Sequence, residues 1–369
     1  MFLLKHIHKE VLILLMLLPL GCSHEPSKGE RLNVARVFPD VDLYDFISVT
    51  DTTVLGFSYP DSLLCKLYHI GQSDTSDVRA ESFLRYGRAQ NEMLQPLFFA
   101  TDENLYVIEC QGGPTKAMAI GLSEIESGHA LYTPLDLSWI KGYSYFSSIY
   151  PISGSLFLAI SKTKDSGELF RKEVLFLVDI IKQTITPVNL VFEDDYGYED
   201  LIKKIVYTNN ANIYLNKKMG KLAYTCGEGR LFDLYDYSSG VLSGRNRVLD
   251  IMPRYKAEEK GGLMSLSLMD KINRGIRPSF TDDYICIAYN QPDDSETFKG
   301  YPGFYIDQID VFDWDGRLVV TFKMDKPFST YKISKDNKYI YTLSMDLETG
   351  ETEIRQYITS IYDIRSVKP

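Results

Sequence analysis

The chain has 369 residues, of which 44% are hydrophobic and 24% charged, and this balance excludes a wholly disordered protein. Its 26 tyrosines and 19 phenylalanines favour β-strands, because aromatic side chains pack well on a pleated, half-buried surface. With a net charge of −10 and no long basic run, the chain repels phosphate backbones, so nucleic acid is not an expected partner. Arg245 and Arg247 form a sparse basic pair that we expect to be solvated in a loop.

The N-terminus has the features of an export signal. Lys5 and Lys9 precede the apolar run Val11–Leu20, which is about half as long as a membrane-spanning helix and matches the apolar core of a signal peptide. The run ends in Leu-Pro-Leu-Gly-Cys, residues 18–22, which resembles a bacterial lipobox and implies that Cys22 carries a lipid. The alternative is an ordinary cleaved signal followed by an incidental cysteine.

The next segment, residues 23–30, is polar and contains Pro and Gly, as flexible tethers do. We therefore expect a signal peptide over residues 1–21, a lipidated tether over 22–31 and one folded domain over 32–369. The expected location is the cell envelope, at the outer membrane, with the periplasmic or the outer face left open.

A repeated pattern runs through the folded part, in which a polar turn introduces an apolar, strand-like run. Asp51, Asp102 and Ser153 stand in three such turns at a spacing of 51 residues, which matches four strands plus loops. The runs with their turns occupy residues 50–59, 100–110, 151–160, 216–226, 280–289 and 334–344. Each is followed by a second run, which we interpret as the third strand of the same unit; these cover residues 64–71, 115–122, 174–180, 231–240, 309–316 and 352–358.

One of these third strands contains three carboxylates, Asp310, Asp313 and Asp315, so an acid/base site must be weighed against a hairpin turn. Asp315 and Gly316 supply the positive φ of a tight turn, while Asp310 and Asp313, an odd number of positions apart, face opposite sides of a strand. The spacing therefore predicts a hairpin rather than a catalytic pair.

Six units are counted, starting near residues 42, 95, 143, 203, 275 and 328. This number predicts an all-β, six-bladed β-propeller with four-stranded antiparallel blades. We expect the run Leu32–Phe38 to pair with the last blade near Ile354–Ile364 and close the ring, which removes the free sheet edges. Two insertions interrupt the rhythm, and we predict a short helical turn or two over Lys256–Asp270 and a polar hairpin loop over residues 291–304.

The segment RYGRAQNEM, residues 85–93, stands between the first two units. With the blade rhythm, it resembles the TolB-like six-bladed propeller lipoproteins of Bacteroides-type bacteria, whose G-R-G-P-x-E segment is matched by Gly87, Arg88 and Glu92. Ala89 and Gln90 replace Gly and Pro of that pattern. The resemblance implies the fold and an envelope location and supplies no catalytic residue. A sheet cap in which Arg88 and Glu92 pair is the alternative reading.

The remaining candidate residues, which are cysteines, histidines and an acidic run, are expected to have structural roles. None of the body cysteines has CxxC spacing, so buried free thiols are expected, with one or two disulfides as the alternative; they are Cys65, Cys110, Cys226 and Cys286. His24, His69 and His129 are isolated, so neither a metal site nor any cofactor is expected. The acidic run at residues 193–200 is expected to be a solvated loop rather than a calcium site, since it lacks the EF-hand spacing.

The sequence favours one function and leaves a second open. The first is a non-catalytic binding or scaffolding module that is held at the membrane by its lipid and takes a protein, peptide or glycan partner. The second is an extracytoplasmic enzyme that acts on polysaccharide at the propeller funnel. No catalytic residue is assigned, because the sequence has no G-x-S-x-G elbow and few histidines.

Overall fold

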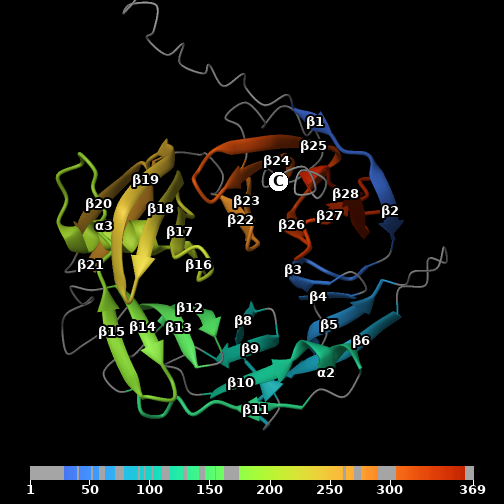
Figure 1. Ribbon diagram of the computed structural model, residues 1–369, viewed down its shortest axis with the longest axis horizontal. Helices are drawn as coiled ribbons and strands as arrows, with labels where there is room; N and C mark the ends of the chain where they lie inside the picture. The colour runs from blue at the N-terminus through green and yellow to red at the C-terminus, as the bar shows by residue number, and fades with distance from the viewer. Residues whose placement is uncertain are drawn as a thin grey trace, which may run out of the picture.

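The computed structural model describes residues 29–361 with gaps at 40, 51–52, 58–62, 71–78, 90–91, 95, 102, 110–115, 128–130, 141–145, 154, 162–173, 261–262, 270–275 and 290–304. Within these residues the chain forms six four-stranded antiparallel blades arranged as a ring (Figure 1). The fold predicted from the repeats is therefore confirmed. Cys22, Cys110 and the predicted signal peptide lie outside the described residues.

The first three blades follow the predicted order from the inner strand outward. Blade 1 consists of β3 (Asp45–Val49), β4 (Thr53–Phe57), β5 (Leu63–His69) and β6 (Arg79–Tyr86), with β7 (Glu92–Met93) beside β6. Blade 2 consists of β8 (Pro96–Ala100), β9 (Asn104–Glu109), β10 (Lys116–Gly121) and β11 (Thr133–Pro134), with the helix α2 (Leu122–Glu126) before β11. Blade 3 consists of β12 (Phe146–Ser153), β13 (Leu156–Ser161), β14 (Leu175–Asp179) and β15 (Thr184–Val188).

The other three blades complete the ring. Blade 4 consists of β16 (Asn212–Asn216), β17 (Lys221–Cys226), β18 (Arg230–Ser238) and β19 (Val241–Ile251). Blade 5 consists of β22 (Arg277–Phe280), β23 (Tyr284–Ala288), β24 (Ile306–Asp313) and β25 (Leu318–Phe328), and β1 (Glu30–Arg31) pairs with β25 in parallel. Blade 6 consists of β26 (Thr330–Ile333), β27 (Tyr339–Met345), β28 (Thr352–Ile358) and β2 (Val34–Phe38).

The ring is closed by the N-terminal strand β2. It pairs antiparallel with β28 in a register that sets Val34 opposite Tyr357 and Phe38 opposite Ile354, which confirms the predicted closure. The chain reaches the sheets with β1, and the buried side chain of Leu32 packs into the core between blades 5 and 6. Strand β2 from the N-terminal part and the last strand β28 therefore share blade 6, while β1 joins blade 5.

The apolar core is divided among the junctions of the ring. Six hydrophobic clusters are found, one between each pair of neighbouring blades. The second strand of each blade serves two clusters, because its successive side chains point to opposite faces; β23, for example, is buried at all five positions. The continuous apolar runs that marked the repeats in the sequence are these second strands.

The turn at Asp313–Gly316 is a hairpin turn between β24 and β25. Asp313 Oδ1 accepts hydrogen bonds from the backbone N–H groups of Asp315, at 3.0 Å, and Arg317, at 2.9 Å. Gly316 has a φ of 81°, which a glycine adopts without strain. The stretch is therefore a hairpin, as the spacing predicts, although Asp313 rather than Asp315 holds the turn and only Gly316 of the Asp-Gly pair has a positive φ.

Two elements differ from the prediction. A short helical turn or two was expected over Lys256–Asp270, but β20 (Tyr255–Lys260) and β21 (Leu263–Leu268) pair with each other antiparallel. The Gly-Gly pair between two strand-length runs is a hairpin signal. Blade 4 was expected to begin near residue 203, where the structure has the helix α3 (Asp200–Thr208), which buries Ile202 and Val206 at helical spacing.

Candidate functional site

The structure places the described residues of the RYGRAQNEM segment, 85–89 and 92–93, at the connection between blades 1 and 2. The Glu92 carboxylate accepts a hydrogen bond from Ala89 N–H at 2.9 Å, and Gly87 donates its N–H to Met93 O at 3.1 Å. A Cβ atom on Gly87 would lie 1.9 Å from a Glu92 carboxylate oxygen, so only glycine fits there. The Glu92 carboxylate therefore binds the backbone of the link and does not pair with Arg88, whose side chain is exposed.

Blade 2 also binds the link that contains Glu92. Lys116 at the start of β10 donates hydrogen bonds to the backbone carbonyls of Ala89 and Glu92, the second at 2.6 Å. Met93 is fully buried in the core between blades 1 and 2. These contacts give the segment a role in positioning the two blades.

The body cysteines in the described residues are buried, free thiols. Cys65, Cys226 and Cys286 lie in three different junction cores and form no disulfide. Burial raises the pKa of the Cys226 thiol to about 11 and that of Cys286 to about 12, because an apolar surrounding disfavours the thiolate. They are therefore poor nucleophiles in the folded protein.

The two unpredicted elements, α3 and the β20–β21 hairpin, form an accessory layer together with the loop 193–199. In Figure 1 this layer lies at the outer edge of the ring beside blade 4. Tyr255 in β20 donates a hydrogen bond to Asp194 Oδ2 at 2.7 Å, and the Tyr198 hydroxyl accepts one from Ala257 N–H at 3.2 Å. Lys203 of α3 adds an ion pair to Asp194 at 3.4 Å. The layer is thus cross-linked internally.

The acidic run at residues 193–200 was expected to be a solvated loop, and the structure agrees only in part. The Asp194 side chain is 2% exposed, while Tyr196 remains 41% exposed beside Tyr255. In the described residues, no group of three or more His, Cys, Asp and Glu side chains is arranged to hold a metal ion. The burial of Asp194 follows from the hairpin, whose residues were expected to be helical.

A second buried carboxylate lies in blade 4. The Asp233 side chain is 2% exposed and accepts hydrogen bonds from Arg245 Nε at 3.1 Å and from Arg247 Nε at 2.9 Å. Loss of solvent raises the pKa of the Asp233 carboxyl, and Arg247 opposes that rise. Arg245 and Arg247 were expected to be solvated in a loop; β19 instead directs both onto a carboxylate of β18.

A third polar cluster joins blades 4 and 5. Asp310 is buried, and its carboxylate accepts hydrogen bonds from the hydroxyls of Tyr289 and Thr321, both at 2.7 Å, and from Gln308 Nε2 at 3.2 Å. The guanidinium carbon of Arg230, at the start of β18, lies 5.2 Å from the centre of the Tyr289 ring. Asp310 was correctly expected on a strand, but its hydrogen-bond partners come from different parts of blade 5, and Arg230, which contacts Tyr289, comes from blade 4, so the cluster left no signal in the sequence.

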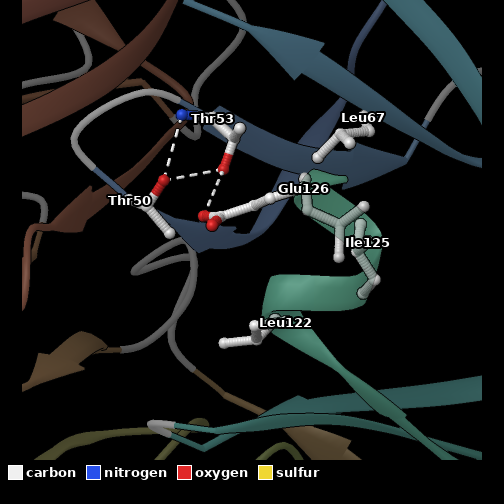
Figure 2. Close-up of a pocket in the computed structure, with 7 residues that line it drawn as sticks. Thr50, Thr53, Leu67, Leu122, Ile125 and Glu126 are labelled. Atoms are coloured by element: carbon white, nitrogen blue, oxygen red, sulfur yellow. Dashed lines mark hydrogen bonds between the residues drawn. The ribbon is translucent and has the colours of Figure 1, made fainter. Parts of the chain in front are cut away.

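A small pocket lies between blades 1 and 2 (Figure 2). Its volume of about 10 Å³ is near the least that holds one water molecule. Glu126 of α2 lies against Thr53, whose hydroxyl is 2.7 Å from that of Thr50, and apolar side chains line the rest. The pocket is too small for an organic ligand.

The six inner strands surround the axis of the ring (Figure 1). Several of their side chains are partly exposed, in contrast to the buried second strands: β8 is partly exposed at four positions and exposed at the fifth. On β26, Thr330 and Lys332 are partly exposed and alternate with buried Tyr331 and Ile333. We call the part of the ring formed by the inner strands the axial surface; it consists of β3, β8, β12, β16, β22 and β26.

Comparison with known proteins identifies no family. No protein-family model matches the chain, and no curated protein matches it. Among solved structures, a member of the DUF4221 family from Bacteroides vulgatus is 12% identical, with a TM-score of 0.49 over 89% of this chain and 97% of that one. A protein from Bacteroides thetaiotaomicron is 11% identical, with a TM-score of 0.45 over 90% and 73% of the two chains.

An oligogalacturonate lyase in complex with manganese is 9% identical, with a TM-score of 0.41 over 86% of this chain and 77% of that one. These likenesses are too distant to carry a functional argument, and the resemblance to TolB-like lipoproteins stays a prediction. No helix in the described part of the chain is long and apolar enough to cross a membrane.

Proposed function

We propose that the protein is a lipid-anchored propeller of the cell envelope that acts as a non-catalytic binding or scaffolding module. Its partner is a protein, a peptide or a glycan. The observation that supports this proposal is the accessory layer, which is not needed to close the ring and yet is fixed by the buried contact between Tyr255 and Asp194. A surface that is already ordered loses little conformational entropy when a partner binds.

The accessory layer also presents an exposed aromatic ring. Tyr196 packs against Tyr255 in a T-shaped arrangement and stays 41% exposed, so its ring is held in place while part of it remains accessible. Fixed tyrosines are common at protein interfaces, because they offer a large contact area with one polar tip. The layer therefore has both the rigidity and the chemistry of a binding surface.

The binding test uses glycan and peptide arrays with purified residues 23–369. We expect a ligand that binds the wild-type chain and is lost in Tyr196→Ser. The matched control is Ile181→Ser, which removes an 81% exposed apolar side chain from the turn between β14 and β15 of blade 3, outside the accessory layer. Silence on every array, or equal loss in both variants, contradicts the proposal.

The anchor has its own test. Cys22→Ala removes the only acceptor for the lipid in the predicted lipobox, so the chain should leave the membrane fraction. Retention of the Cys22→Ala variant in washed membranes would show that the lipid is not what holds it there. Protease digestion of intact cells then shows whether the protein faces the periplasm or the cell exterior.

A second candidate function is supported by the cluster of Arg230, Tyr289 and Asp310. A tyrosine, an arginine and a carboxylate that meet between blades are a candidate acid/base set for an extracytoplasmic enzyme acting on polysaccharide. The three hydrogen bonds on Asp310 favour a structural role. Release of reducing ends by the wild-type chain, lost in Asp310→Asn, would favour the enzyme.

A further inference from the structure

Five turns of blades 4, 5 and 6 lie at the same end of their sheets. In an antiparallel blade whose strands follow chain order, the first and third turns share one end and the second turn lies at the other. We call the surface made by the first and third turns of blades 4 and 5 and the first turn of blade 6 the turn face. It consists of residues 217–220, 239–240, 281–283, 314–317 and 334–338.

Hydrogen bonds between blades join the turn face into one surface. Asn216 Nδ2, at the end of β16 in blade 4, donates to Asp282 O of blade 5 at 2.8 Å. Asn337 Nδ2 of blade 6 donates to Asp283 Oδ2 of blade 5 at 3.0 Å. The first turns of these three blades are therefore in contact, and the turn face is continuous over half of the ring.

The N-terminal strand enters the ring from the side of the turn face. β1 runs parallel to β25, which begins beside the turn 314–317 and leads away from it, so the chain before β1 comes from that side (Figure 1). Glu30 in β1 accepts a hydrogen bond from the Ser360 hydroxyl at 2.5 Å. The neighbouring Thr359 donates its backbone N–H to Lys338 O, in the turn face, at 2.9 Å. The start of β1 is thus tied to the turn face of blade 6.

Only a short stretch of sequence separates β1 from the predicted lipid. Cys22 and Glu30 are eight positions apart, so even a fully extended chain between them spans at most about 29 Å. The nine residues of β18, which run from the other end of blade 4 to the turn face, span about 27 Å. A lipid on Cys22 therefore reaches a bilayer at the turn face easily, whereas reaching round the sheets to their other end would use nearly the whole length. We expect the turn face to lie nearest the bilayer.

The turn face presents lysine and apolar side chains together. Lys217 and Lys218 are exposed, and neither forms an ion pair within the described part of the chain. Met219 beside them is 47% exposed, and Val241 and Leu318, at the first positions of β19 and β25, are 65% and 43% exposed. At a bilayer surface, lysines contact anionic headgroups while apolar side chains enter the boundary with the acyl chains. The composition of the turn face therefore fits an anionic lipid surface.

The charge of the whole chain makes this orientation selective. The net charge is −10, so an anionic bilayer repels most of the molecule. The second turn of blade 6, residues 346–351, lies at the other end of the sheets and contains Asp346, Glu348 and Glu351 but no basic residue. Repulsion at that end and attraction at Lys217 and Lys218 both direct the turn face to the bilayer.

We propose that the turn face of blades 4, 5 and 6 docks on an anionic lipid bilayer, with Lys217 and Lys218 at the phosphate headgroups and Met219 at their level. This orientation rests on the lipid anchor proposed above and extends it from an attachment point to a surface. α3 precedes β16 and the β20–β21 hairpin follows β19, both at strand ends remote from the turn face. The accessory layer therefore points away from the bilayer and stays open to a partner.

The experiment uses the lipidated protein in vesicles of phosphatidylethanolamine and phosphatidylglycerol whose brominated acyl chains quench tryptophan fluorescence. Met219→Trp places the fluorophore at the turn face. Its matched control, Leu347→Trp, replaces a side chain that is 46% exposed in the 346–351 turn at the other end. After subtraction of the wild-type signal, we expect quenching in Met219→Trp and none in Leu347→Trp. Adding Lys217→Glu and Lys218→Glu to Met219→Trp should remove most of that quenching, because the anionic surface then repels this turn.

Each other outcome contradicts a defined part of the inference. Equal quenching in Met219→Trp and Leu347→Trp, quenching in neither, or stronger quenching in Leu347→Trp would overturn the orientation and leave the anchor standing. Quenching in Met219→Trp that survives both charge reversals would overturn the role of Lys217 and Lys218. Release of the wild-type protein from the vesicles would instead contradict the lipid anchor itself, and with it the docking that rests on it.

Discussion

The closing strand β2 can be tested at a single side chain. Phe38 is buried to 6% exposure in the core between blades 6 and 1, where it faces the partner strand position Ile354. Replacing a buried phenylalanine by alanine removes its transfer free energy and leaves a cavity, which costs about 3 kcal/mol or more. The adjacent Val37 is 40% exposed, so Val37→Ala should change the free energy of unfolding by no more than about 0.5 kcal/mol.

The assay is urea unfolding of the two variants, followed by amide hydrogen exchange. If β2 seals the ring, Phe38→Ala speeds exchange in β28, whose hydrogen bonds then open more often, and leaves β17 in blade 4 unchanged. A Phe38→Ala variant that unfolds within about 0.5 kcal/mol of Val37→Ala would show that β2 is not docked in solution. Equal changes in β28 and β17 would show a global loss of stability instead of a local opening.

Two further predictions concern the interior. Asp233→Ala leaves two guanidinium groups without their carboxylate and should lower the free energy of unfolding by about 3 kcal/mol. The control Asp250→Ala removes a carboxylate that is 68% exposed and should lower it by less than about 1 kcal/mol. Equal losses of stability in urea unfolding would refute this difference. The thiols of Cys65, Cys226 and Cys286 should react with iodoacetamide at pH 8 only after unfolding, because burial raises their pKa values; labelling of any of the three in the native protein, detected by peptide mass, would contradict their burial.

The fold was predictable because each blade repeats one local signal. The second strand is buried on both faces and appears as a continuous apolar run, so Tyr284–Ala288 could be recognised without knowledge of its neighbours. The closing strand was predictable for a related reason. Val34–Phe38 is strand-like, stands before the first blade, and has one unfilled place in the last blade to occupy.

The candidate sites were less predictable, because their residues meet only in three dimensions. Asp233 and Arg247 are fourteen positions apart and meet through the β18–β19 register, which a bulge shifts. Asp310 and Arg230 come from different blades and meet only through Tyr289. The hairpin at β20–β21 was misassigned because the lysine and glutamate residues of Lys256–Lys260 favour helices in isolation, whereas pairing with β21 decides the structure.

The ionic groups of the interior separate by whether the fold supplies their partners. Asp233 has two arginines, Asp194 has a tyrosine and a lysine, and Asp310 has three donors, so packing alone explains why each is retained. Lys332 on the inner strand β26 is partly exposed, so water rather than the fold can solvate its ammonium.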